Sequence, residues 1–161
     1  VSDIPFKPNP YYGQNNFLTY GNFDLNIIKE RVLVHFEKEL ESHIKLFSEN
    51  LNFKYRSYNI RSSWIAKFEK GNDAHIHDHG SSDISGVYYY KKCDSDGNIF
   101  FQSPVAQSES SMCFWNPHFQ ISTEQGELLL FPGYLKHGIH TNNTEEDRIS
   151  FSFDIVFNRM E

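Results

Sequence analysis

The sequence has few cysteines, no cluster of basic residues and no long apolar run, and each scarcity argues against a class of protein. Its two cysteines, Cys93 and Cys113, can form at most one disulfide, too few for a disulfide-stapled secreted fold. A net charge of −6 without a run of lysine or arginine argues against a nucleic-acid-binding surface. No apolar segment approaches the roughly 18 residues of a membrane span, and no signal peptide is visible. We therefore expect reduced thiols in a cytoplasmic protein that binds neither membranes nor nucleic acid.

Aromatic residues, by contrast, are abundant, and their kinds favour strands over a helical bundle. Fifteen phenylalanines and nine tyrosines contribute to an aromatic share of 16%, and such residues pack well on a pleated surface. A chain of 161 residues has the usual size of one domain. We predict a single, mainly β domain over residues 1–161. An irregular arm and a helix would occupy residues 1–50, followed by a β core over about residues 52–158.

One helix is predicted ahead of the β core. Asp24 is a typical N-cap residue, and we expect the helix to end near Asn50, either unbroken or with one break. Apolar residues recur at helical spacing along it, namely Leu25, Ile28, Val32, Phe36, Leu40 and Ile44. Because the intervening positions are mostly polar or charged, the helix is expected to pack one face against a sheet.

Short apolar or alternating segments, separated by turn residues, make up the rest of the chain. The predicted strands are residues 64–68, 84–91, 99–102, 127–131, 136–141 and 148–157. Residues 112–115 and 118–122 are expected to be two further short strands or one mobile segment. The turn at residues 94–97 predicts a hairpin that pairs the strands on either side of it. Many short strands with regular turns indicate a sandwich or a barrel.

Three of the eight histidines alternate along one segment: His75, His77 and His79. On an extended strand they would share a face, with about 6.6–7 Å between neighbours. Because metal–nitrogen bonds are about 2 Å long, one ion could take an adjacent pair but not easily all three. His77 belongs to both possible pairs, with His79 or, in the alternative register, with His75. A third ligand must come from elsewhere in the chain.

Two further histidines, His137 and His140, lie on a later predicted strand. They are three positions apart and would therefore point to opposite faces, so only one of them can join a metal site. His137 follows an apolar strand and a Pro-Gly turn, which places it at the mouth of a barrel, where binding sites are common. His140 and His118 are expected to be ordinary surface histidines.

Arg148 and Ser150 share one face of the last predicted strand, with apolar residues on the other face. A guanidinium inside a barrel is costly unless it holds an anion, and its planar fork fits a carboxylate. A metal together with such an anchor could chelate a 2-oxo acid. The keto acid end would bind iron, the far carboxylate would bind Arg148 and Ser150, and open positions on Fe(II) would take O2.

These motifs resemble, in order and spacing, those of the Fe(II)/2-oxoglutarate-dependent oxygenases over about residues 64–157. The likeness is greatest to a group of such proteins common in marine bacteria and their phages. The matching segments are His77-Asp78-His79, Ile84–Tyr89, Gly126–Pro132, Leu135-Lys136-His137 and Arg148-Ile149-Ser150. The resemblance implies a double-stranded β-helix, which is a jelly roll or cupin-like barrel. It also implies a prolyl-hydroxylase-like dioxygenase that couples 2-oxoglutarate and O2 to hydroxylation of a substrate.

The resemblance further implies a role for each site residue. The Fe(II) ligands would be His77, His79 and His137. The residues that hold 2-oxoglutarate, the co-substrate, would be Arg148, Ser150 and Tyr89. Most of the superfamily has a carboxylate where this chain has His79, so the three-histidine set carries one negative charge less. Asp78 cannot replace that carboxylate, because on a regular strand it faces away from His77.

Two other functions also fit the residues. One is a cupin-like metalloenzyme that binds its substrate at three histidines without 2-oxoglutarate, and the other is a non-enzymatic metal-binding β-sandwich. The sequence does not name the substrate: a peptide side chain and a small metabolite both fit, and Trp115 and Asn116 are expected to line its site. A homodimer is also compatible with the sequence.

Overall fold

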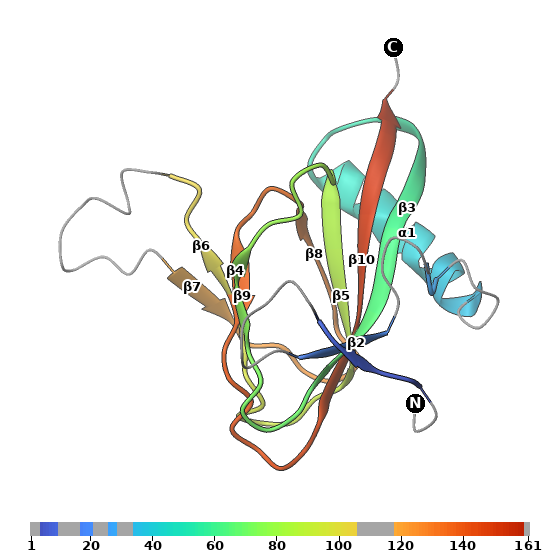
Figure 1. Cartoon of the computed structure of the whole chain (residues 1–161). Helices are drawn as coiled ribbons and strands as arrows, with labels where there is room; N and C mark the ends of the chain where they lie inside the picture. The colour runs from blue at the N-terminus through green and yellow to red at the C-terminus, as the bar shows by residue number, and fades with distance from the viewer. Residues whose placement is uncertain (1–3, 10–16, 21–25, 29–33, 106–117, 160–161) are drawn as a thin grey trace.

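Two antiparallel β-sheets and one helix make up the described part of the chain (Figure 1). The computed structural model describes residues 4–9, 17–20, 26–28, 34–105 and 118–159. The larger sheet has the strand order β1-β2-β3-β10-β5-β8, and the smaller sheet has the order β4-β9-β6-β7. The elements are β1 (Lys7–Pro8), β2 (Leu18–Tyr20), α1 (Val34–Asn50), β3 (Tyr55–Phe68), β4 (Ala74–His77), β5 (Ile84–Lys91), β6 (Ile99–Gln102), β7 (His118–Ile121), β8 (Leu128–Pro132), β9 (His137–Ile139) and β10 (Arg148–Arg159).

The chain passes back and forth between the two sheets. β3, β5, β8 and β10 lie in the larger sheet, whereas β4, β6, β7 and β9 form the smaller one. All neighbouring strands are antiparallel. This alternation is the strand order of a jelly roll, and the prediction of a mainly β fold is confirmed. Val87, Ile99, Phe101 and Phe131 form an apolar cluster with Tyr89 from strands of both sheets.

The hairpin predicted at residues 94–97 is wrong. β5 pairs with β10 and β8 in the larger sheet, whereas β6 pairs with β7 and β9 in the smaller sheet. The turn residues reverse the chain as predicted, but turn chemistry does not select the strand with which the returning segment pairs. The choice follows from burial, because in the smaller sheet Ile99 and Phe101 pack across the interior against Phe131.

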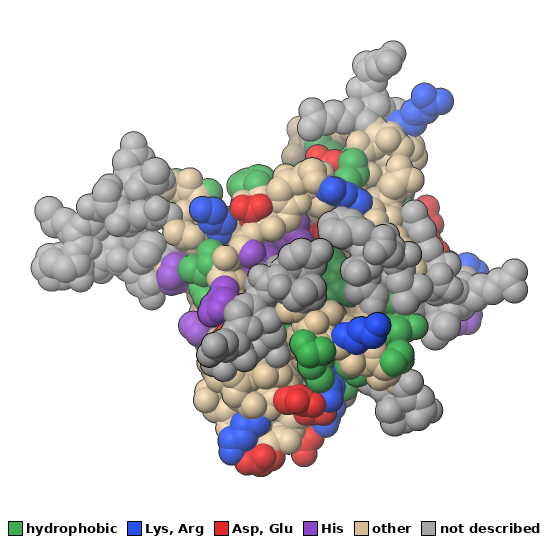
Figure 2. Space-filling model, viewed as in Figure 1, with side chains coloured by type: hydrophobic (Ala, Val, Ile, Leu, Met, Phe, Trp, Pro, Cys, Tyr) green, Lys and Arg blue, Asp and Glu red, His purple; other side chains and the backbone are tan. Residues whose placement is uncertain are grey.

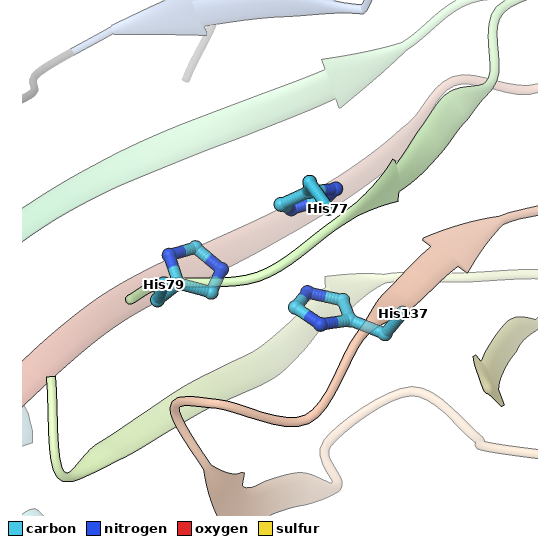
Figure 3. Close-up of side chains that lie close together, drawn as sticks. All are labelled: His77, His79 and His137. Atoms are coloured by element: carbon cyan, nitrogen blue, oxygen red, sulfur yellow. The ribbon is translucent and has the colours of Figure 1, made fainter. Parts of the chain in front are cut away.

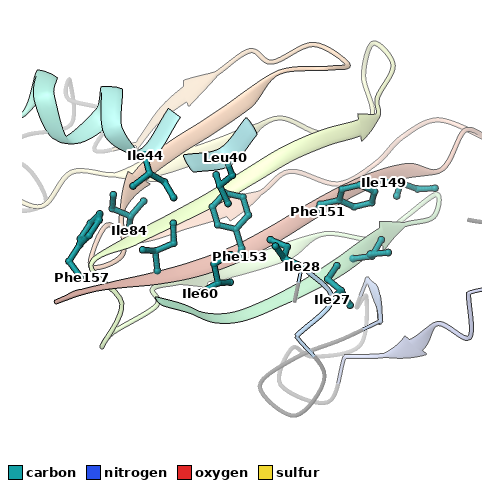
Figure 4. Packing of buried hydrophobic residues seen from close by; sticks show 12 residues of the cluster. Ile27, Ile28, Leu40, Ile44, Ile60, Ile84, Ile149, Phe151, Phe153 and Phe157 are labelled. Carbon is teal, nitrogen blue, oxygen red and sulfur yellow. The ribbon is translucent and has the colours of Figure 1, made fainter. Parts of the chain in front are cut away.

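Helix α1 covers the outer face of the larger sheet (Figures 1 and 4). The predicted helix was to include Ile28, which is wrong, since residues 27 and 28 form a turn. The backbone N–H of Ile28 donates to Ser63 Oγ at 3.0 Å, and Asn26 Nδ2 donates to the carbonyl of Ile60 at 2.9 Å. These bonds to β3 replace helical ones, while the predicted cap, Asp24, lies outside the described residues. Helix α1 lacks the length and apolarity to cross a membrane, and no other helix occurs in the described residues.

Strand β10 lies between β3 and β5 and divides the interior into two unlike halves. One face is apolar and packs with Leu40 and Ile44 of α1 (Figure 4); it carries Ile149, Phe151, Phe153, Ile155 and Phe157. The opposite face is polar and buried as well; it carries Arg148, Ser150, Ser152 and Asp154. Because successive side chains of a strand alternate, this polar row faces the smaller sheet. It forms the floor of the site described below.

The packing between β5 and β10 generates a prediction about stability. Gly86 lies opposite Phe153, and a Cβ added there would overlap the Phe153 ring. We expect Gly86→Ala to lower the free energy of unfolding by about 1–3 kcal/mol, as overpacked cores do, measured by urea denaturation. In a Phe153→Leu background the same substitution should cost less, because the smaller side chain leaves room. Equal costs in both backgrounds would contradict this account.

Candidate metal centre

Three imidazoles meet at the edge where the two sheets face each other (Figure 3). The ring centroids of His77 and His137 lie 4.4 Å apart, and each is 5.2 Å from that of His79. One ring nitrogen from each residue lies within 4.8 Å of the other two. Among the described residues, no other group of three histidine, cysteine or acidic side chains approaches this closely. Histidine side chains also gather on the surface shown in Figure 2.

Backbone pairing places each of these rings. His77 ends β4 and lies directly opposite His137, the first residue of β9. His79 lies in the loop after β4, where its N–H donates to the carbonyl of Gly133 at 2.9 Å. A side chain at Gly133 would overlap the carbonyl of Ser82, so glycine permits this close approach of two loops. The turn between β8 and β9 therefore holds the loop that carries His79.

His75 does not join the group, so the alternative register is not the one that the structure adopts. Ala74 pairs with Ile139 and His77 pairs with His137, which leaves one extra residue on β4. Such a bulge breaks the alternation of side chains, and His75 is exposed. The two other residues proposed from the sequence to line a substrate site, Trp115 and Asn116, lie outside the described residues.

Hydrogen bonds fix the tautomer of all three rings. Nδ1 of His77 lies 2.7 Å from the carbonyl of His75, and Nδ1 of His137 lies 2.9 Å from that of Leu135. Nδ1 of His79 lies 3.2 Å from Oδ1 of Asp154. Carbonyl and carboxylate oxygens accept hydrogen bonds, so each Nδ1 is the donor. Nε2 would thereby be the metal-ligating nitrogen in each ring, an arrangement typical of metal-binding histidines.

Burial keeps the imidazoles of His77 and His137 neutral. It lowers the pKa of His77 to about 4 and that of His137 to about 3. The neighbouring imidazoles lower both pKa values further, whereas the charge of Asp154 raises them by less than burial lowers them. Metal ions bind the neutral form of histidine. Both rings are therefore ready to coordinate a metal at neutral pH without first losing a proton.

Asp154 contacts the histidine group, and the sequence reasoning did not single it out. Its Oδ1 accepts a hydrogen bond from Ser85 Oγ at 2.7 Å, and its Oδ2 accepts one from Ser62 Oγ at 2.8 Å. These serines lie directly opposite Asp154 on β3 and β5. Although burial raises the pKa of Asp154, hydrogen bonds from His79 and the serines outweigh it and keep that pKa below the usual value. The available signal was the alternation of Arg148, Ser150 and Ser152, which continues to residue 154.

Arg148 is fully buried at the other end of the same strand face. Its guanidinium carbon lies 5.0 Å from the ring centroid of Phe68 and 5.1 Å from that of Tyr89. Nη1 donates to the carbonyl of Gly97 at 3.2 Å, but Nε and Nη2 have no partner among the described residues. A buried cation with two unmet donors is expensive. The guanidinium therefore calls for an anion that accepts two parallel hydrogen bonds.

Two buried hydroxyls accompany this guanidinium. Tyr89 Oη and Thr123 Oγ1 also lack a partner among the described residues. Burial raises the pKa of Tyr89, although the nearby positive charge of Arg148 opposes that rise. The three side chains thus present several unmet donors together, which is the donor set that a carboxylate requires. The sequence had predicted Arg148 and Tyr89 here but not Thr123.

A cavity of about 40 Å³ lies against the three imidazoles and Ser150. Ser150 is buried and lies directly opposite Tyr89 on β5. One water molecule needs about 10–15 Å³, so the cavity has room for more than one. A larger ligand must displace side chains of the wall, among which Phe17 comes from the N-terminal arm. Phe17 stacks on Phe68 with ring centroids 4.5 Å apart.

The sequence of residues 62–154 matches the protein family described as "Putative 2OG-Fe(II) oxygenase". This segment is more than half of the chain and contains the three histidines, Asp154 and Arg148. The chain therefore belongs to this family of oxygenases, whose name implies dependence on Fe(II) and 2-oxoglutarate. A comparison with curated proteins gave no match. The expectation of a marine bacterial or phage origin stays a prediction.

Solved structures share the fold. A prolyl-4-hydroxylase from Pseudomonas putida superposes with a TM-score of 0.66 at 11% identity, covering 98% of this chain and 80% of that one. A 2OG-Fe(II) oxygenase family oxidoreductase from Burkholderia pseudomallei gives 0.64 at 13% identity, covering 99% and 78%. HygX from Streptomyces hygroscopicus, with nickel and 2-oxoglutarate bound, gives 0.64 at 12% identity, covering 96% and 74%. The predicted resemblance to prolyl-hydroxylase-like oxygenases is confirmed, and these likenesses establish the fold.

The geometry of the three imidazoles predicts which substitutions weaken metal binding. We expect His137→Ala and His79→Ala to weaken Co(II) affinity by at least about 100-fold, because each removes a ligand rather than a ligand's hydrogen-bond partner. Titration of the apo protein, followed by visible absorption, measures the affinity. His75→Ala is the matched control from the same segment and should leave the affinity unchanged. Equal losses at His75 and His79 would contradict the ligand assignment.

The lowered pKa values predict how the metal-free protein responds to pH. The unfolded chain takes up protons near the ordinary histidine pKa of 6.5, whereas folded His77 and His137 resist protonation down to about 4 and 3. The unfolded state is therefore favoured as pH falls below 6.5, by about 1 kcal/mol per histidine at pH 5.5. Urea denaturation at pH 7.5 and 5.5 measures this loss. The loss of unfolding free energy between the two pH values should be smaller in a His77→Gln/His137→Gln variant. It should persist in His140→Gln, the control, which changes an exposed ring. An undiminished loss in the double variant would refute the prediction.

Proposed function

We propose that the protein is an Fe(II)- and 2-oxoglutarate-dependent dioxygenase that hydroxylates a peptide side chain or a small molecule. One observation carries the proposal: a metal-ligand set and a buried, half-satisfied guanidinium occupy opposite ends of one polar strand face. His79, one of the three histidines, is bonded to Asp154 on β10, and Arg148 is the first residue of the same strand. A ligand with a metal-chelating end and a distant carboxylate would meet both requirements.

The histidines would hold iron through Nε2. Their Nδ1 atoms are occupied by two backbone carbonyls and one carboxylate, so the rings are oriented before a metal arrives. Bound at this site, Fe(II) with 2-oxoglutarate and O2 would supply the oxidising chemistry. The rings of Phe101 and Phe131 have centroids 5.8 Å and 4.7 Å from that of His137. These apolar rings limit the access of water to one side of the centre.

Arg148 would bind the far carboxylate of 2-oxoglutarate. Nε and Nη2, its two unpartnered nitrogens, form one edge of the planar guanidinium and can donate two parallel hydrogen bonds to a carboxylate. The third nitrogen, Nη1, is held by the carbonyl of Gly97, which fixes the direction of that edge. The hydroxyls of Tyr89, Thr123 and Ser150 would complete the carboxylate site.

The unpartnered Nε and Nη2 atoms of Arg148 favour this function over the two others that the sequence allowed. A cupin-like enzyme that binds only its substrate at the metal has no need for a buried Arg148 with unmet donors. A non-enzymatic β-sandwich would leave that desolvation cost unrelieved. The choice between peptide and small-molecule substrates, and the presence of a homodimer, stay predictions.

The proposal is tested by anaerobic titration with 2-oxoglutarate. The Fe(II)-loaded protein should develop a visible metal-to-ligand band, and 2-oxoglutarate should yield succinate once O2 is admitted. We expect Arg148→Met to weaken 2-oxoglutarate binding about 100-fold or more, because charge-assisted hydrogen bonds contribute about 1.5–3 kcal/mol each. Its affinity for Fe(II) alone should be unchanged, and replacing a buried, unmet charge should not destabilise the fold.

Matched variants separate the two ends of the site. His137→Ala should abolish both the band and succinate formation, since it removes an iron ligand. His140→Ala, three residues away on the outer face, should preserve both. No band in the parent protein, or unchanged 2-oxoglutarate affinity in Arg148→Met, would overturn the proposed function.

A further inference from the structure

A set of three histidines would bring no negative charge to a bound metal, because the metal-binding form of histidine is the neutral imidazole. Asp154 is the carboxylate bonded to this set: its Oδ1 lies 3.2 Å from Nδ1 of His79. Asp78, in contrast, is exposed and accepts the N–H of Gly80 at 2.9 Å. A buried negative charge thus contacts a ligand without occupying the metal position itself.

We propose that Asp154 is a positioning residue for His79. The carboxylate of Asp154 would accept the Nδ1–H of His79, which orients the ring, and would place a compensating negative charge near the metal. The inference rests on the proposed function, in that His79 must be an iron ligand. Histidine ligands that donate to a carboxylate become more basic and bind metal more tightly. The negative charge that most of the superfamily carries on a direct ligand would here act through one imidazole.

His79 needs such a partner more than the other two ligands do. His77 and His137 lie in paired strands, and backbone carbonyls two residues earlier hold their Nδ1 atoms. His79 lies in a loop beyond the end of β4 and has no ladder of its own. Its ring is held between the indole of Trp64, 5.7 Å away between centroids, and the carboxylate of Asp154.

The surroundings of Asp154 suit it to an indirect role. Both oxygens are occupied, Oδ1 by Ser85 and His79 and Oδ2 by Ser62. The serines come from the strands on either side of β10, so they fix the carboxylate from both flanks. To ligate a metal directly, Asp154 would have to break these bonds. Its side chain is buried, with 2% exposed, so bulk water screens its charge little.

Co(II) titration of the apo protein tests the inference. Asp154→Asn keeps the shape and removes the charge, and we expect it to weaken Co(II) affinity by about 10–100-fold and to shift the visible bands of the bound metal. Asp78→Asn is the matched control, because it removes a neighbouring charge while the amide oxygen can still cap Gly80. Its Co(II) affinity and bands should match those of the parent. Unchanged Co(II) affinity in Asp154→Asn would overturn the inference.

A double-mutant cycle distinguishes positioning from a structural role. In a His79→Ala background, Asp154→Asn should change the Co(II) affinity less than about threefold, since the ring through which it acts is gone. The same loss in both backgrounds would overturn the inference, because Asp154 would then act on the fold rather than on His79. Thermal unfolding of the four apo proteins reports any effect on stability separately.

A second variant covers the case in which Asp154→Asn does not fold. Ser62→Ala/Ser85→Ala releases the carboxylate without changing its charge, and it should weaken Co(II) binding and shift the bands in the same direction; parent-like behaviour would count against the inference. Failure of the proposed function would look different. The parent protein would then show no band with 2-oxoglutarate, whatever the behaviour of Asp154→Asn.

Discussion

The burial of a polar strand face is the constraint on which this structure depends. β10 must bury both faces because α1 covers one and the smaller sheet covers the other. Its inward row of Arg148, Ser150, Ser152 and Asp154 is removed from water, and a buried polar group is costly without partners. At one end the partners are protein groups, Ser62, Ser85 and His79. At the other end they are incomplete, and this difference marks the end at which a ligand carboxylate would bind.

The metal end is preorganised by hydrogen bonds rather than by the metal. Two of the Nδ1 acceptors are backbone carbonyls, which the fold supplies whatever the side chains are. The third is a side chain, Asp154, and it belongs to the ligand that lies outside a strand. Burial meanwhile keeps His77 and His137 uncharged, so three rings can approach one another without mutual repulsion. Orientation and protonation thus both favour metal binding.

The buried carboxylate of Asp154 contacts the histidine group through one ring, that of His79. Under the proposed function its negative charge would act on the metal through that imidazole rather than by direct ligation. Two serines on flanking strands hold that carboxylate. The histidine group and the buried guanidinium, at opposite ends of β10, therefore depend on the same register of β3, β10 and β5.

Local sequence patterns predicted most of the later strands and the alternating faces of β10, but they did not predict β1, β2 or residues 55–63 of β3. Period-two alternation depends only on neighbouring residues, so it could be read directly for residues 148–157. Pairing could not be read in this way. The turn at residues 94–97 joins different sheets, Ile28 bonds to β3 instead of continuing a helix, and a bulge turns His75 away. The partnership of His79 with Asp154 joins residues 75 positions apart, and only the register of three strands, set by burial of both faces of β10, decided it.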